Sequence, residues 1–262
     1  MFRKPSLLRF LLPLLALGLG LPAPACVKSL RWSDDAPYSA RGADGELQGI
    51  DIEINQELMR RLGCQLEFKE MPFGRGLREL EAGSLDMMGS AFRRPERERF
   101  AWFSAPVLQA RKRLFVRRAD LPGFRARNLR EWLQGGVTLG VLPGVVYGPE
   151  FSALQQDPAL QPHIHTVVNR RSLWLMLDRE RIDGMLVDEL TAAYELRRLA
   201  LDERLAPAPL VVESEPSYTA FSKRSTAPEF VARYNEALAA MARDGSLARI
   251  LARHGNRPQP GP

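Results

Sequence analysis

The segment from Ile50 to Phe68 reads IDIEINQELMRRLGCQLEF and predicts a helix that passes directly into a strand. Apolar residues recur at helical spacing on one face of this segment: Ile50, Ile54, Leu58 and Leu62. Gly63 suits the left-handed turn with which many helices end. The residues from Gln65 to Phe68 then alternate polar and apolar side chains, as a half-buried strand does. An α/β alternation is therefore expected around this segment.

Similar units flank the segment on both sides. Strands are expected over Leu30–Ser33 and Leu85–Met88, and a second helix is expected over Gly74–Ala82, ended by Gly83. The resulting strand–helix–strand–helix–strand order predicts a parallel sheet with helices on both faces.

A second α/β unit begins near Ala110. It is expected to contain helices over 128–134, 172–178 and 189–199 and strands over 136–142 and 182–187. After an extended segment at 210–213, helices over 227–243 and 245–254 end the chain. We therefore expect two lobes: residues 26–110 with 210–256, and an inserted lobe, 111–209. Extended crossings near 105–115 and 205–221 would join them.

The first 25 residues have the composition of a secretory signal peptide. A basic start with Arg3, Lys4 and Arg9 precedes an apolar core, and Ala23-Pro24-Ala25 is a small-residue cleavage site. Cleavage after Ala25 would export the protein to the periplasm. At the other end, the Pro-rich residues 257–262 are expected to form a disordered tail.

Two cysteines, Cys26 and Cys64, remain after such cleavage. In an oxidising compartment an isolated pair favours a disulfide, and each cysteine directly precedes an expected strand. The alternative is that Cys26 is a lipid-anchored N-terminus. The residues before it lack the leucine and small-residue pattern expected for lipidation, so the disulfide is preferred.

The charge balance argues against a nucleic-acid partner. The formal net charge of +6 falls to +3 once Arg3, Lys4 and Arg9 are removed, and the arginines are mixed with glutamates. No phosphate loop or dinucleotide motif is present, so no cofactor is expected. The histidine pair His163 and His165 has no third ligand beside it, so no metal site is expected.

The stretch from Gly83 to Pro106, GSLDMMGSAFRRPERERFAWFSAP, suggests a site for a small anion. Its expected strand ends in small residues, among them Ser90 and Ala91, which let a ligand approach the backbone. Arginines follow at once, and an arginine held beside such a turn offers a fork of donors matched to a carboxylate.

Four motifs in this order resemble those of the family 3 periplasmic solute-binding proteins, receptors for polar amino acids in bacterial uptake systems. The motifs are DGELQGIDIEINQELMRRLG from Asp44, GSLDMM with RPERERFAWFSAP, ERIDGMLVDELTAAY from Glu180, and NEALAAMARDGSLARILARHG from Asn235. The resemblance spans Leu30 to Gly255. It implies a two-lobed α/β fold of the type II kind, with two crossover strands and a cleft that closes by a hinge.

The resemblance also implies roles for single residues. Arg97 matches the arginine that binds the ligand α-carboxylate, Asp188 the aspartate that binds the α-ammonium, and Tyr38 the aromatic residue that covers the ligand. Arg97 and Asp188 would present opposite charges from opposite lobes, so a zwitterion could bridge them. Other readings stay open: Arg97 as a solvated arginine in a charged run, and Asp188 as a helix cap.

The sequence departs from the family pattern at three places, one of which is a spacing between strand and arginine that is one residue shorter. Arg94 stands where the family has a threonine, and Gly144 is followed by Val145 rather than threonine. Arg75 and Arg94 near the expected cleft would favour an acidic amino acid or a related carboxylate. Phe73 could stack on the ligand or belong to the core.

The leading hypothesis is a monomeric, non-enzymatic periplasmic receptor that delivers a small zwitterion or carboxylate to an ABC permease. One alternative is an enzyme resembling the cyclohexadienyl dehydratases on the same fold, which would need a general acid in the cleft. Another is a ligand-sensing partner of a membrane sensor.

Overall fold

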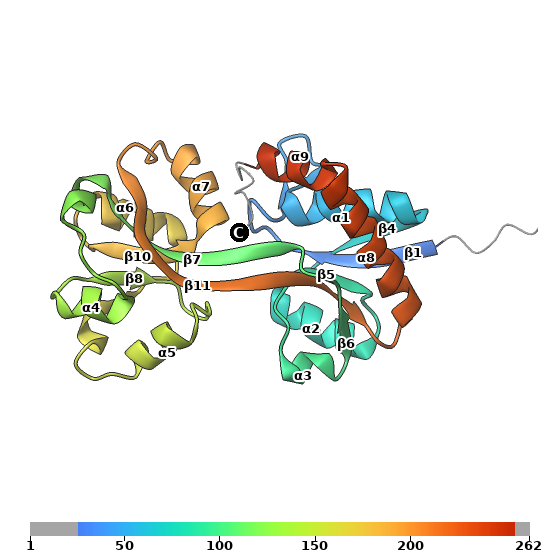
Figure 1. Ribbon diagram of the computed structural model, residues 1–262, viewed down its shortest axis with the longest axis horizontal. Coiled ribbons are helices and arrows are strands. Elements are labelled where there is room, and N and C mark those ends of the chain that lie inside the picture. The colour runs from blue at the N-terminus through green and yellow to red at the C-terminus, as the bar shows by residue number, and fades with distance from the viewer. Residues whose placement is uncertain (1–25, 255–262) are drawn as a thin grey trace, which may run out of the picture.

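The structure, a computed structural model, describes residues 26–254 and has a two-lobed α/β fold (Figure 1). The expected signal peptide with its cleavage after Ala25, and the expected tail 257–262, lie outside the described residues. The fold class predicted from the sequence is confirmed.

The first lobe lies on the right in Figure 1 and carries both ends of the described chain. Its elements are β1 (Cys26–Trp32), β2 (Ala40–Arg41), β3 (Leu47–Gln48), α1 (Ile50–Leu62), β4 (Cys64–Glu70), α2 (Phe73–Ala82), β5 (Met87–Ala91), α3 (Pro95–Glu98), β6 (Ala101–Phe103), α8 (Pro228–Arg243) and α9 (Ser246–Arg253). Strand β1 pairs in parallel with both β4 and β5. The carboxyl ends of these three strands therefore meet at one edge.

Helix α1 follows the periodicity of its sequence. Ile50, Ile54 and Leu58 are buried and pack with residues of α8, including Tyr234, in one core cluster. Gly63 ends the helix with φ 67°, the left-handed conformation expected there. The returning chain thus helps to build the core of the first lobe.

The second lobe lies on the left in Figure 1. Its elements are a 3₁₀ turn (Arg118–Gly123), α4 (Leu129–Gln134), β8 (Leu139–Val141), α5 (Pro149–Gln155), a 3₁₀ turn (Gln161–His163), β9 (Ile164–Thr166), α6 (Arg170–Asp178), β10 (Gly184–Asp188) and α7 (Glu189–Arg198). Strand β8 pairs in parallel with β9 and β10. Asp188 and the loop after β8 therefore lie at the same edge.

Two long antiparallel strands join the lobes, as Figure 1 shows. Strand β7 (Leu108–Arg117) pairs with β10, and β11 (Leu205–Ser222) pairs with β7, β5 and β6. They are the two crossover strands expected from the fold class, and they make one continuous sheet through both lobes.

Two expectations about the strands were wrong in detail. The expected strand 85–88 is β5 at Met87–Ala91, so Ser90 and Ala91 belong to the strand rather than follow it. The sheet is mixed rather than parallel, because β11 runs antiparallel beside β5. The extended segment expected at 210–213 lies within the 18-residue strand β11, which coincides with the extended crossing expected at 205–221. Backbone pairing with β7 explains why this segment stays extended.

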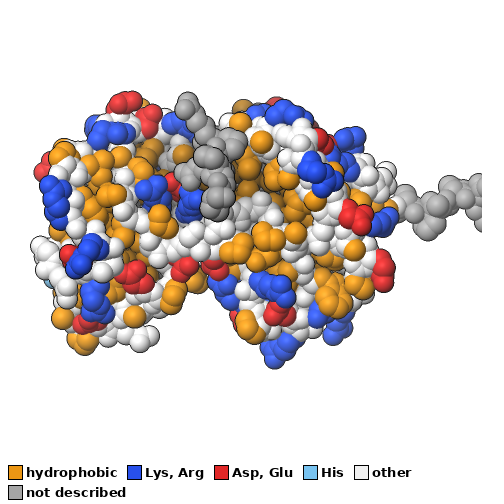
Figure 2. Space-filling view, viewed as in Figure 1, with side chains coloured by type: hydrophobic (Ala, Val, Ile, Leu, Met, Phe, Trp, Pro, Cys, Tyr) orange, Lys and Arg blue, Asp and Glu red, His pale blue; other side chains and the backbone are white. Residues whose placement is uncertain are grey.

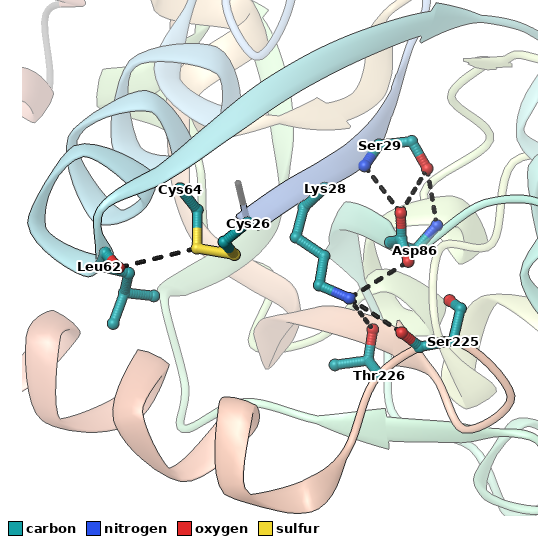
Figure 3. The surroundings of a disulfide bond; sticks show 8 residues. All are labelled: Cys26, Lys28, Ser29, Leu62, Cys64, Asp86, Ser225 and Thr226. Atoms are coloured by element: carbon teal, nitrogen blue, oxygen red, sulfur yellow. Dashed lines mark hydrogen bonds and ion pairs between the residues drawn. A yellow bond between two sulfur atoms is a disulfide. The ribbon is translucent and has the colours of Figure 1, made fainter. Parts of the chain in front are cut away.

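The disulfide between Cys26 and Cys64 is confirmed (Figure 3). The two cysteines are direct partners in the parallel register of β1 and β4. A sulfur atom engaged in this bond cannot at the same time carry a lipid thioether. The bridge therefore fixes the start of the described chain to the edge strand of the sheet.

A polar cluster beside the disulfide ties β1 to the returning chain (Figure 3). The Asp86 carboxylate accepts from the backbone N–H and hydroxyl of Ser29, at 2.9 and 2.8 Å, and pairs with Lys28 Nζ at 3.3 Å. Lys28 Nζ also donates to the Ser225 carbonyl, just before α8. These contacts hold α8 against the sheet.

The visible surface carries acidic and basic side chains in alternation (Figure 2). Among the residues 26–254, no helix is both long enough and apolar enough to cross a membrane.

Candidate ligand-binding site

The candidate site lies where the carboxyl ends of the parallel strands of the two lobes face each other. In open α/β sheets, this edge is where ligands bind. A hydrogen bond crosses this edge: the hydroxyl of Tyr38, in the loop after β1, donates to Asp188 Oδ1 at 2.7 Å. A second, longer contact joins Arg170 of α6 to Asp35 at 3.5 Å. Tyr38 and Asp188, both expected at the site, are thus brought together.

Asp188 is 7% exposed and is the N-cap of α7. Its Oδ1 accepts from the backbone N–H groups of Leu190 and Thr191, at 3.1 and 3.2 Å, as a capping carboxylate does. The capping role considered from the sequence is therefore present.

The other oxygen of this carboxylate, Oδ2, is buried and has no hydrogen-bond partner among the described residues. The ammonium of Lys112 lies 3.6 Å away, across the β7–β10 register. A buried acceptor without a donor is costly, so Oδ2 is suited to receive a donor from a ligand.

Tyr38 is held as a neutral donor. Burial, and then the neighbouring Asp188 carboxylate, raise the pKa of the Tyr38 hydroxyl well above its ordinary value. The hydroxyl therefore stays protonated at physiological pH and keeps its hydrogen bond to Asp188.

Arg97 lies in α3, on the first lobe, and is half-buried. One nitrogen donates to the Phe92 carbonyl at 3.0 Å, and the guanidinium carbon lies 5.5 Å from the centre of the Phe73 ring. Burial and the nearby Arg94 lower the pKa of Arg97. No ion pair or hydrogen bond between described residues joins Arg97 to Asp188; the Asp188 carboxylate pairs with Lys112 at 3.6 Å, whereas Arg97 has no ion pair among residues 26–254.

Arg31 at the end of β1 was missed by the sequence analysis. Its guanidinium carbon lies 5.6 Å from the same Phe73 ring, and its Nε donates to the Met71 carbonyl at 2.9 Å. A second nitrogen donates to the Ser33 hydroxyl. The signal was available: Arg31 interrupts an apolar strand between the buried Leu30 and Trp32, so it had to face the opposite side of the sheet.

Asp51 was also missed. It lies in the first turn of α1 and accepts a 3.0 Å hydrogen bond from the Ser90 hydroxyl. Burial raises the pKa of Asp51 to about 7, against the opposing effect of Ser90. Ser90 has φ 48°, and a Cβ on Gly89 would lie 2.9 Å from the Asp51 carboxyl, so this part of β5 is shaped around Asp51.

Two arginines expected near the site are paired elsewhere. Arg75 is exposed and contacts Glu79 at 3.3 Å along α2. Arg94 pairs with Glu215 of β11 through two contacts, at 2.8 and 2.9 Å. Their charges are thus balanced by side chains of the protein itself.

Of the remaining expected residues, Phe73 contacts Arg97, and the others lie elsewhere in the two lobes. Gly144, with φ 73°, and Val145, 39% exposed, lie in the loop after β8, at the same edge of the second lobe as Asp188. The Ala91 side chain is fully buried among core residues of the first lobe, so only its backbone could meet a ligand. Phe73 packs partly against that same core and partly against the two arginines.

The fold and this arrangement define a two-lobed solute-binding protein. The chain belongs to the bacterial extracellular solute-binding proteins, family 3, whose profile matches residues 32–257. The resemblance stated from the four sequence motifs is thereby confirmed.

Individual relatives are distant. The chain is 24% identical to the L-cystine-binding protein TcyJ of Escherichia coli, over 82% of this chain and 76% of that protein. It is 24% identical to the histidine-binding periplasmic protein of Salmonella typhimurium, over 84% of this chain and 83% of that protein. An ancestral cationic amino acid solute-binding protein has a similar structure, with a TM-score of 0.71 and 22% identity, over 88% of this chain and 96% of that one.

Proposed function

We propose that this protein is a periplasmic receptor that binds an amino-acid-like zwitterion between its lobes and delivers it to an ABC permease. Arg97 would bind the α-carboxylate and Asp188 the α-ammonium, while the Tyr38 ring covers the ligand. The observation that carries this proposal is the buried Oδ2 of Asp188, which accepts no hydrogen bond from the described residues and lies 3.6 Å from the Lys112 ammonium, at the edge where the lobes face each other. The amino-acid-binding relatives support the ligand class.

The proposal includes closure of one lobe on the other. The moving bodies would be residues 26–110 with 210–256, and residues 111–209. A zwitterion that touches both lobes binds the closed form better than the open form, and this difference in affinity drives closure. Export would follow cleavage after Ala25, and mass spectrometry of the secreted protein should then find Cys26 as its first residue.

Calorimetric titration with the proteinogenic amino acids tests the binding proposal. Asp188→Asn keeps a residue that can cap α7 but removes the charge, and Arg97→Gln removes the other charge. Charge-assisted hydrogen bonds contribute about 1.5–3 kcal/mol each, so either variant should lower affinity at least about tenfold. Asp202→Asn is the control, because it removes a carboxylate from an exposed site on the same lobe. Unchanged affinity in Asp188→Asn would contradict the proposal.

A second candidate, a cyclohexadienyl-dehydratase-like enzyme, is favoured by Asp51. Such a reaction needs a protonated acid near the leaving hydroxyl, and Asp51 is the described carboxyl whose pKa is raised to about 7. Incubation of the purified protein with prephenate or arogenate tests it. Turnover by the wild type that is lost in Asp51→Asn would support an enzymatic function. Absence of turnover by the wild type would contradict it and leave the receptor function as the remaining proposal.

A further inference from the structure

Two half-buried arginines, Arg31 and Arg97, contact the Phe73 ring, yet neither forms an ion pair within the described part of the chain. Other partly buried arginines of this protein do have such partners. Arg113 pairs with Glu189 at 2.8 Å, and Arg117 pairs with Asp183 at 3.0 Å. The lack of an ion pair therefore distinguishes the two arginines beside Phe73 from these other partly buried arginines.

The carboxylates nearest to Arg31 have other partners. Burial, the larger effect, lowers the pKa of Arg31, whereas the negative charges of Asp35 and Asp51 both act to raise it. Asp35, however, contacts Arg170 of the other lobe, and Asp51 accepts from Ser90. Because the pKa of Asp51 is about 7, this carboxyl carries only part of a negative charge at neutral pH.

The positive charge of Arg97 also has no carboxylate paired with it among the described residues. The charged groups that shift its pKa are Arg94, Glu96 and Glu215, and Glu215 forms its ion pair with Arg94. The first turn of α2, which begins at Phe73, has no acidic residue. Burial lowers the pKa of both Arg31 and Arg97, which means that their desolvation is not fully compensated.

Both guanidiniums keep donors for a ligand. A guanidinium has five N–H donors. Arg31 uses donors on Nε and one terminal nitrogen, toward Met71 and Ser33, and Arg97 uses one terminal nitrogen, toward Phe92. Each arginine can therefore offer further N–H groups to an oxygen anion.

We propose that Arg31 is a second anion-binding residue of the site and binds a carboxylate on the ligand side chain, so that the preferred ligands are acidic amino acids. This inference rests on the proposed function, in which Arg97 holds the α-carboxylate. Arg75 and Arg94, expected from the sequence to favour an acidic ligand, are paired with glutamates of the protein. Arg31 has no such partner among the described residues and would favour the acidic ligand in their place.

Titration of the purified protein with matched ligands tests the inference. Glutamate and glutamine, like aspartate and asparagine, differ mainly in the charge of the side chain. The protein should bind the acid at least about tenfold more tightly than the amide. Arg31→Gln should remove this preference by weakening acid binding about tenfold or more, with less than about a threefold change for the amide. Arg31→Lys, which keeps the charge, should restore part of the preference.

Arg78→Gln is the matched control, because Arg78 is an exposed arginine of α2 that forms no ion pair or side-chain hydrogen bond within residues 26–254. Circular dichroism and the urea midpoint would show whether each variant is folded. The inference is overturned if Arg31→Gln weakens acid and amide equally, or if the protein binds the amide as tightly as the acid. In both cases amino-acid binding itself persists and the proposed function stands.

Glutarate tests the anion-binding role of Arg31 apart from amino-acid binding. It has two carboxylates but no ammonium. If glutarate binds and glutamate does not, and Arg31→Gln abolishes glutarate binding, Arg31 is an anion-binding residue of the site, but the preference for acidic amino acids and the amino-acid function are both wrong. If no amino acid and no dicarboxylate binds, the anion-binding role of Arg31 is wrong as well.

Discussion

Burial of the Asp51 carboxyl disfavours its charged form and raises its pKa. This carboxyl lies between the first turn of α1 and the backbone of β5 at Gly89, and within residues 26–254 only the Ser90 hydroxyl donates to it from a side chain. Burial raises the pKa of Asp51 from 3.8 to about 7. The folded protein therefore holds a proton there that the unfolded chain has already released between those two pH values.

The sign of the pH effect follows from this difference. Between about pH 4 and pH 7 the folded state binds one proton more than the unfolded state at Asp51, so the free energy of unfolding falls as the pH rises. Asp51→Asn removes this dependence. We expect the variant to gain at least about 1 kcal/mol relative to the wild type on going from pH 4.5 to pH 8.

Urea denaturation of both proteins at the two pH values measures this gain. The comparison cancels the carboxyls whose pKa is lowered, such as Glu57 and Asp244, because both proteins have them. Parallel pH profiles for wild type and variant would show that the Asp51 pKa is not raised.

At the level of elements, the start of α1 positions Tyr38. The backbone N–H groups of Ile50 and Asp51 donate to the carbonyls of Pro37 and Tyr38, both at 2.9 Å. Gly49 makes this approach possible, since a Cβ there would lie 2.5 Å from the Tyr38 carbonyl oxygen, and its φ is 126°. The unsatisfied N–H groups at the helix start are thus used to fix the loop.

Gly49→Ala should therefore lower both stability and ligand affinity. The left-handed conformation and the clash with backbone together should cost more than about 2 kcal/mol. Gly45→Ala is the control: its φ is 86°, but no atom lies within 4 Å of the added Cβ, so about 1 kcal/mol is expected. Denaturation curves and titrations would measure both effects. Equal losses in the two variants would contradict the role of the close approach.

The disulfide stabilises the edge of the first lobe through the unfolded chain. Cys26 and Cys64 are separated by 38 positions, and the entropy of closing such a loop corresponds to roughly 3–4 kcal/mol. The double variant Cys26→Ser, Cys64→Ser should lose about this much stability. Wild-type protein unfolded in the presence of a reductant should give the same denaturation midpoint as the variant. A loss below about 1 kcal/mol would mean that the unfolded chain is restrained in another way.

Patterns within one element could be predicted from the sequence. The apolar face of α1 was predicted from the helical spacing of its apolar residues. The helix cap at Asp188 was predicted as an alternative role because an aspartate stands directly before a helix. The disulfide was predicted because the two cysteines stand at the starts of two expected strands. Each of these needs information only from neighbouring residues or from a simple topological rule.

Contacts between distant elements could not be predicted. Strand alternation places Arg31 on one face of the sheet but does not say that Met71 and Phe73 lie there. The extended crossing at 205–221 was expected, but its pairing with β7, which joins residues such as Leu205 and Arg117, has no local signal in the sequence. The same limit applies to the hydrogen bond between Tyr38 and Asp188.

For the whole molecule, the hydrogen bond from Tyr38 to Asp188 is the direct link that should set the balance between open and closed forms. A hydrogen bond to a charged group contributes about 1.5–3 kcal/mol, whereas the longer Arg170–Asp35 pair should contribute less than about 1 kcal/mol. Tyr38→Phe keeps the ring that is proposed to cover the ligand but removes the donor, so the ligand-free population should shift at least about tenfold toward the open form. Small-angle scattering should then give a larger radius of gyration without ligand and an unchanged one at saturation.

Tyr194→Phe is the control. Tyr194 is a half-buried tyrosine of α7 whose hydroxyl forms no hydrogen bond within residues 26–254, so its removal should change neither radius of gyration. Identical ligand-free scattering from Tyr38→Phe and wild type would show that this bond does not hold the lobes together.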